Sequence, residues 1–296
     1  MTLLAANRWP FRLHATYDES ISRFLNVFES VNRDIPLKGL NWFFDHCETV
    51  SASNLERIKV LGGGIAVQHR MAYQGEYFME RYGKEAAERT PPIRKMLEMG
   101  IPVGAGTDAT RVASYNPWIS LYWMATGKTV GGTSLFSEKS RLTREEALQL
   151  YTQGSSWFSA ENGKKGALAV GQLADLAVLT EDYFNVPDEA IKGIESVLTI
   201  VGGNIVYANG DFAPFTPPVL PVMPEWSPTK VFGGCGAPLD AKRAARAGVP
   251  FQPHQHNSAC RQSGCLHSWQ RLLAGTELAS NRFSGFWGLG CDCFAF

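Results

Sequence analysis

The stretch Gly104-Ala105-Gly106-Thr107-Asp108-Ala109 decides the fold of this chain. It follows the apolar residues Gly100-Ile101-Pro102-Val103, so the sequence predicts a buried strand that ends near an aspartate. In parallel α/β proteins, the carboxyl ends of the strands carry the residues that do chemistry. Asp108 is therefore a candidate functional residue.

Two earlier segments have the same layout. Phe11-Arg12-Leu13-His14 predicts a short strand that ends in a histidine, and a second predicted strand, within residues 41–48, ends at His46. Imidazole and carboxylate groups suit a divalent first-row metal, and zinc is the metal we expect. The sequence thus predicts a metal site made of His14, His46 and Asp108.

The order of these motifs resembles the amidohydrolase superfamily, and within it the third amidohydrolase family, whose members are like N-substituted formamide deformylase. Further motifs follow in the order of that family. Residues 142–148 are similar to its last barrel helix, residues 166–179 to its return into a β-sandwich, and residues 201–207 to its closing strands. The resemblance covers residues 10 to 212, about two thirds of the chain.

The resemblance implies a metal-dependent (β/α)8 barrel of the TIM type with a small β-sandwich. It places His14, His46 and Asp108 at the ends of barrel strands five, six and eight. The strand-one ligands of the family, and the residue that bridges its metals, have no counterpart before His14. We therefore expect an α/β fold that is the C-terminal half of such a barrel, in a truncated form of the enzyme.

This expectation divides the chain into three parts. Residues 1–165 are predicted to form a partial barrel, residues 166–212 a portion of the β-sandwich, and residues 213–296 a Pro-rich linker and a tail. The tail contains Cys260, Cys265 and His267, and three alternatives stay open for it: a loosely packed segment, a small zinc site or a disulfide.

For function, the resemblance implies hydrolysis of a non-peptide carbon–nitrogen bond, in an amide or formamide of small size. Asp108 would take a proton from the attacking water and pass it to the leaving group. The alternative for Asp108 itself is an aspartate that caps a turn or helix. The alternative for the whole chain is an inactive remnant, or a regulatory protein that uses the half-barrel as a scaffold.

Residues that follow the predicted strand 65–68 are candidates for substrate binding. His69 would face the same mouth as the metal site, and Arg70 is able to bind a carboxylate or polarise a carbonyl. The alternatives are a solvated loop histidine and a surface arginine. An aromatic set, predicted either to line an apolar pocket or to pack, comprises Tyr73, Tyr77, Trp118, Tyr122 and Trp123.

Several helices are predicted from apolar periodicity and end signals. We expect one over residues 18–31 with Asp18 as its cap, others over residues 53–61 and 91–99, and one that begins at Thr143 with a capping box.

Composition excludes some classes of partner. The 296 residues contain 28 Lys and Arg and 28 Asp and Glu, so no strong field favours nucleic acid or an anionic membrane. The sequence has no apolar run of the roughly 18 residues that a membrane helix needs. No signal peptide is evident at the start, so a cytoplasmic location is expected. Open sheet edges predict association with another chain or with the missing N-terminal half.

Overall fold

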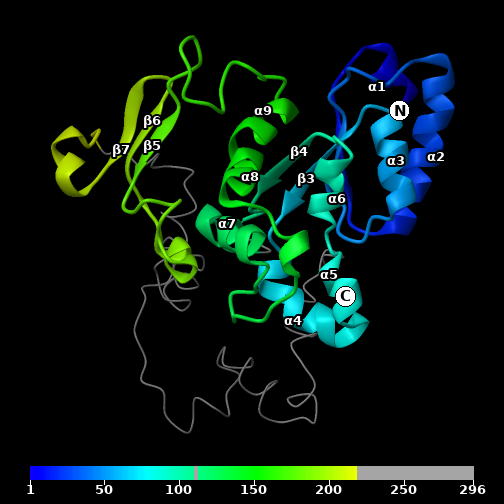
Figure 1. Cartoon of the computed structure of the whole chain (residues 1–296). Helices are drawn as coiled ribbons and strands as arrows, with labels where there is room; N and C mark the ends of the chain where they lie inside the picture. The colour runs from blue at the N-terminus through cyan, green and yellow to red at the C-terminus, as the bar shows by residue number, and fades with distance from the viewer. Residues whose placement is uncertain (110–112, 219–296) are drawn as a thin grey trace, which may run out of the picture. The chain divides into compact units, whose positions relative to one another are not determined.

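A four-stranded parallel sheet is the centre of the computed structural model, which describes residues 1–109 and 113–218. Residues Met1–Pro217 belong to one compact unit. The strands run in the order β1-β2-β3-β4 and span Arg12–Ala15, Phe43–His46, Gly64–Gln68 and Val103–Gly106. Figure 1 labels β3 and β4 of this sheet. All four predicted strands are present, so the expected α/β fold with a parallel sheet is confirmed.

Helices connect the strands, as parallel neighbours require. The first set comprises α1 Thr2–Ala6, α2 Asp18–Asp34, α3 Ala52–Val60, α4 Met71–Tyr82, α5 Lys84–Glu88 and α6 Ile93–Glu98. After β4 come α7 Pro117–Thr126 and the 3-10 helix η1 Glu138–Ser140. One continuous helical segment then joins α8 Arg144–Gln149, the π turn η2 Leu150–Gly154 and α9 Ser155–Phe158.

A smaller antiparallel sheet follows. Its strands, in the order β5-β6-β7, span Leu176–Leu179, Ser196–Val201 and Asn204–Ala208. Two 3-10 helices accompany them, η3 Asp188–Gly193 and η4 Gly210–Phe215. The tail and most of the linker predicted for residues 213–296 lie outside the described residues, and the three-part division of the chain stays a prediction.

A local signal explains one helix start, and the structure corrects one expectation. Thr143 Oγ1 accepts from Glu146 N at 3.2 Å, and the Glu146 carboxylate accepts from Thr143 N at 2.7 Å, so the predicted capping box is confirmed. The expectation that Asp18 caps α2 is wrong, because Tyr17 is the N-cap residue and Asp18 already lies in the helix. The Asp18 carboxylate instead accepts from Ser51 N at 2.7 Å, which ties the start of α2 to the start of α3.

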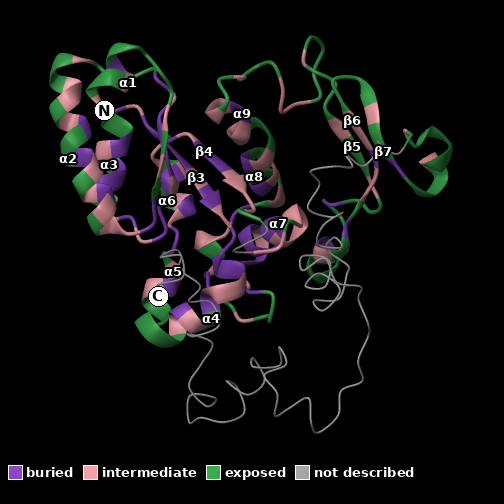
Figure 2. Ribbon diagram, turned by 180° about the vertical axis from the view of Figure 1, so that it is seen from behind, coloured by how far each residue is buried: buried purple, intermediate pink, exposed green. Residues whose placement is uncertain are grey.

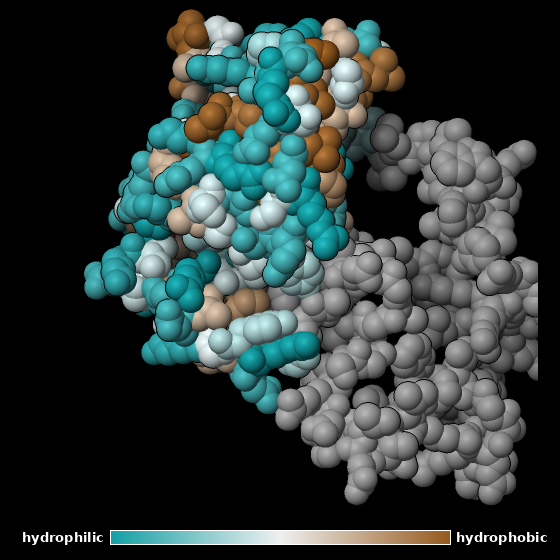
Figure 3. All heavy atoms as spheres, turned by 90° about the vertical axis from the view of Figure 1, so that its right-hand side faces the viewer, coloured by the Kyte–Doolittle hydropathy of each residue, from teal (hydrophilic) through white to brown (hydrophobic). Residues whose placement is uncertain are grey.

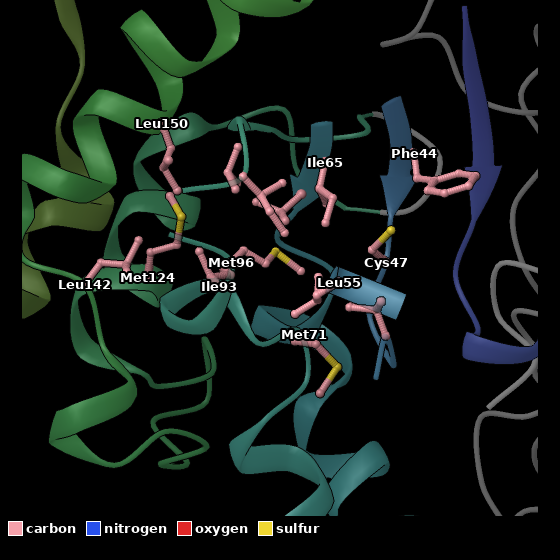
Figure 4. Packing of buried hydrophobic residues seen from close by; sticks show 14 of the residues in the cluster. Phe44, Cys47, Leu55, Ile65, Met71, Ile93, Met96, Met124, Leu142 and Leu150 are labelled. Atoms are coloured by element: carbon pink, nitrogen blue, oxygen red, sulfur yellow. The ribbon is translucent and has the colours of Figure 1, made fainter. Parts of the chain in front are cut away.

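The core lies on one face of the parallel sheet. Successive side chains of a strand point to opposite faces, and Phe44 points toward α2, where its ring stacks on Phe28 at 5.7 Å. Trp42 lies edge-on to both rings. Figure 2 shows the buried residues along the strands and the inner sides of the helices, and Figure 4 shows apolar side chains filling the space beside Phe44 and Ile65.

Aromatic side chains of α9 cover the opposite face of the sheet at glycine positions. A Cβ atom at Gly104 would lie 2.4 Å from Phe158 Cε2, and one at Gly64 would lie 2.6 Å from Trp157 Cζ3. Phe158 also packs edge-on against Phe43 at 4.4 Å. Closer to the strand ends this cover stops, because a Cβ atom at Gly106 would meet no heavy atom of the described residues within 4 Å. As far as residues 1–109 and 113–218 show, this face is closed below and open at the carboxyl ends of the strands.

The surface agrees with the balanced composition. The face seen in Figure 3 is mostly hydrophilic, with hydrophobic residues gathered toward its top. Within residues 1–109 and 113–218, no helix has the length and apolar character that crossing a membrane requires.

Candidate metal centre

The carboxyl ends of all four parallel strands lie at one edge of the sheet. The strands end at Ala15, His46, Gln68 and Gly106, and the register places Ala15 opposite His46 and Gln68 opposite Gly106. The predicted metal ligands therefore come from strand ends at one edge of the sheet: His14 and His46 from the neighbouring strands β1 and β2, and Asp108 from the turn after β4.

His46 leaves the regular strand geometry at this edge. Its φ is 79° and that of Cys47 is 50°, values that non-glycine residues adopt only when the surrounding structure holds them there. Regular alternation would turn His46 to the side of Ala15 and Val67, which are buried. Instead its ring lies edge-on to the ring of His14, with 4.4 Å between the centroids.

The protonation state of His46 follows from this position. Burial lowers its pKa to about 4, and the positive charges of His14 and Arg70 act in the same direction. His46 is therefore neutral at pH 7, which is the form that coordinates a metal ion.

Asp108 stands two residues beyond β4, with a φ of 52°. Thr107 Oγ1 accepts from Ala109 N at 3.3 Å in this turn, and the alternative of a capping role for Asp108 stays open. Partial desolvation raises the pKa of the Asp108 carboxyl, and His14, Arg70 and Arg12 oppose the rise. These electrostatic contacts place Asp108 in the same neighbourhood as His14.

Asp45 belongs to this neighbourhood and was missed as a site residue from the sequence. It lies opposite His14 in the parallel register, and its side chain is 17% exposed. Burial raises the pKa of its carboxyl; Arg12, at 3.7 Å, and His14 lower it, whereas Asp108 raises it further. The signal that would have found it is the register itself, because residues paired across parallel strands share a face.

His69 and Arg70 are both buried. His69 is 0% exposed, its ring lies beside the backbone of Gly106, and neither ring nitrogen makes a hydrogen bond of normal geometry within the described residues. Burial lowers its pKa to about 4. Arg70 forms an ion pair with Glu48, and both side chains are nearly inaccessible to solvent. The alternatives of a solvated histidine and a surface arginine are therefore wrong, and substrate contact by either residue stays a prediction.

The aromatic set divides between the core and its margin. Tyr122 and Trp123 are 0% exposed and belong to the core, so the packing interpretation is confirmed for them. Tyr73, Tyr77 and Trp118 are partly buried against the same core. A cavity of ≈ 770 Å³ opens elsewhere, beside Tyr17 and Phe78, and none of the predicted site residues lines it.

The fit of these residues to a metal ion is partial. His14 and His46 present two adjacent imidazoles, one of them held neutral by burial. In the part of the chain that the structure describes, no group of three or more His, Cys, Asp or Glu side chains is arranged to hold a metal. The two-histidine part of the predicted site is thus brought together, and the three-residue site stays a prediction.

Comparisons with known proteins identify relatives of this chain. A model of the amidohydrolase family matches residues 1–207. The protein YtcJ of Bacillus subtilis (strain 168) is 25% identical over 199 residues, which are 66% of this chain and 37% of YtcJ. N-substituted formamide deformylase of Arthrobacter pascens is 25% identical over 202 residues, which are 66% of this chain and 36% of that enzyme.

Two solved structures have a similar fold. A metal-dependent hydrolase of Pyrococcus horikoshii OT3, itself uncharacterised, is 24% identical with a TM-score of 0.51 and matches 60% of this chain and 35% of that one. A variant of atrazine chlorohydrolase from Arthrobacter aurescens TC1, complexed with zinc and atraton, is 18% identical with a TM-score of 0.52. The match covers 74% of this chain and 48% of that one. The chain spans little more than a third of the curated relatives named above.

Proposed function

The chain belongs to the amidohydrolase family, and from this we propose that it provides the C-terminal half of a metal-dependent (β/α)8 barrel that hydrolyses non-peptide carbon–nitrogen bonds. The observation that carries the proposal is the pair of imidazoles at the ends of β1 and β2, whose centroids are 4.4 Å apart. Two histidines on neighbouring strand ends are of little use to a hydrophobic core, whereas they suit a metal site.

In this proposal, His14 and His46 supply two nitrogen ligands and Asp108 supplies a carboxylate. A bound divalent metal, with zinc as the expected ion, would polarise a carbonyl group and lower the pKa of water to about 7. Asp108 suits a proton carrier because its pKa is raised and its side chain is exposed to solvent. It would accept a proton from the attacking water and donate it to the leaving nitrogen.

The proposed substrate class is a small amide or formamide. Its support is the similarity to N-substituted formamide deformylase and the opening of the sheet face beside Gly106. His69 and Arg70 border this region, so we keep them as candidates for substrate binding. Since the chain spans about a third of these relatives, we propose that turnover also needs residues from barrel strands one to four, supplied by a further segment or by a partner.

Zinc binding by the full chain is the direct test. Titration calorimetry on the wild type should detect a site that is weakened by His14→Ala, His46→Ala and Asp108→Asn. Asp34→Asn, at the exposed end of α2, is the matched control and should bind zinc as the wild type does. Because cysteines and histidines after residue 250 have side chains of the kind that binds zinc, the difference between wild type and variants defines the site.

Hydrolysis is tested separately, with formamides and N-acyl amino acids as substrates. Any zinc-dependent turnover should disappear in Asp108→Asn and persist in Asp34→Asn. A folded wild type whose zinc binding is unchanged by all three site substitutions would contradict the metal proposal. That outcome would favour the alternative function, a non-catalytic scaffold or regulatory protein built on the same sheet.

A further inference from the structure

A buried ion pair joins the loops that follow β2 and β3. Arg70 Nη2 donates to Glu48 Oε2, and the two side chains are 3% and 2% exposed. Glu48 comes two residues after His46, the last residue of β2, and Arg70 comes two residues after Gln68, the last of β3. The pair therefore bridges the loops after two neighbouring strands, at the edge of the sheet that carries the candidate metal centre.

Such a pair is costly to bury. Removing two charges from water costs several kcal/mol for each ion, of the order that their attraction returns, so stability alone gives little reason to keep one. Glu48 Oε1 has no hydrogen-bond partner within the described residues, so this carboxylate is not fully compensated. A pair that is both buried and incompletely satisfied points to a role in fixing geometry.

The backbone before Glu48 shows what is being fixed. His46 and Cys47 are both in the left-handed region, and two such residues in succession are strained. Cys47 N donates to Ala15 O at 2.9 Å and Thr49 N to Thr16 O at 3.2 Å, so the segment is held along the end of β1. These turns direct Glu48 inward. Without a cation for Glu48 to reach, the segment would be free to relax and to carry the His46 ring away from His14.

We infer that Glu48 and Arg70 are positioning residues: their buried ion pair holds the His46 ring against His14, and Arg70 acts on the two rings through Glu48. The part of this inference that concerns metal rests on the proposed function, whereas the part that concerns the two rings does not.

The experiment measures the two parts independently on the full chain. Selective labelling of the histidine rings allows the nuclear Overhauser effect between His14 and His46 to be observed without metal, and calorimetry gives the zinc affinity. The variants are Arg70→Met, the double variant Glu48→Gln/Arg70→Met, which removes both charges, and Arg70→Lys, which keeps the cation. Arg57→Met is the matched control, since Arg57 pairs with Glu29 at 2.6 Å on the outer helices.

We expect the ring-to-ring signal to be lost in the folded double variant and in Arg70→Met, and zinc affinity to fall by about 10- to 100-fold. Arg70→Lys should recover the signal, and Arg57→Met should leave both readouts unchanged. A double variant that keeps the signal and binds zinc as the wild type does would overturn the inference. Loss of folding in both charge-removing variants would show a merely structural pair and would also overturn it.

The same data separate this inference from the proposed function. If the wild type shows the ring-to-ring signal but no zinc site that depends on His46, the metal proposal fails and the positioning role is still judged by the signal. If the wild type shows no such signal, the positioning role fails whatever the zinc affinity is.

Discussion

The substitution Gly104→Ala tests whether α9 closes the inner face of the sheet below the strand ends. The added Cβ atom would lie 2.4 Å from Phe158 Cε2 and 3.1 Å from the Gly154 carbonyl carbon. Carbon atoms in contact are normally about 3.5–4.0 Å apart, so the Phe158 ring would have to move by about 1 Å or more. Phe43, whose ring centroid lies 4.4 Å from that of Phe158, limits this movement. We expect a loss of about 2 kcal/mol in the free energy of unfolding, within the usual range for overpacking.

Urea denaturation followed by far-UV circular dichroism measures this loss. Gly106→Ala is the matched control on the same strand: its Cβ atom meets open space, so stability should be unchanged or higher by about 0.4–1 kcal/mol. In a Phe158→Ala background, the ring that obstructs position 104 is absent. The cost of Gly104→Ala should then fall below about 1 kcal/mol, the remainder being the contact with Gly154.

Two results would refute this reasoning. The first is a Gly104→Ala variant that is destabilised no more than Gly106→Ala, which would mean that no ring occupies the space above Gly104. Alternatively, the cost of Gly104→Ala could be the same with and without the Phe158 ring, which would show that the two positions are not coupled.

Three further predictions concern pH, capping and metal. His46 and His69 have pKa values of about 4 in the folded chain, below their ordinary value of 6.5, so the unfolded chain takes up protons first as the pH falls. The free energy of unfolding should therefore decrease as the pH drops from 6.5 to 4. In the variant His69→Gln this decrease should be smaller. Thr143→Ala removes the acceptor for Glu146 N and should cost about 1 kcal/mol in urea denaturation, whereas Thr143→Ser should cost less. Zinc at 100 times its dissociation constant should stabilise the chain by about 2.7 kcal/mol, and a chelator should reverse the gain; an unchanged melting temperature would contradict the metal site.

The sequence predicts the parallel strands because their signals are local. Each strand is an apolar run with a polar residue at its end, and Thr143 and Glu146 mark a helix start within four residues. Asp18 shows the limit of such signals. It has the residue type of a cap, but its carboxylate bonds to Ser51, which is 33 positions away in the sequence, and the helix begins one residue earlier than a cap would allow.

The candidate site is predictable only in its residue types. His14 and His46 stand out as strand-end histidines, but nothing local indicates that His46 adopts a left-handed backbone and turns its ring toward His14. The pairing of Glu48 with Arg70 is equally hidden, because the sequence does not show that two charged residues in adjacent loops are buried together. Such features depend on tertiary contacts, which override local preference.

The π turn η2 gives the helical segment from Arg144 to Phe158 a change of phase. A π turn accommodates one extra residue, and each residue of a helix rotates the following side chains by about 100°. Ala147 before the turn is buried, whereas Trp157 and Phe158 after it must meet the sheet at Gly64 and Gly104. A regular α-helix of the same length would rotate both aromatic rings by about 100°, off those glycines. The wider geometry of this one turn therefore lets the buried residues before it and the two rings after it face their partners within a single helical segment.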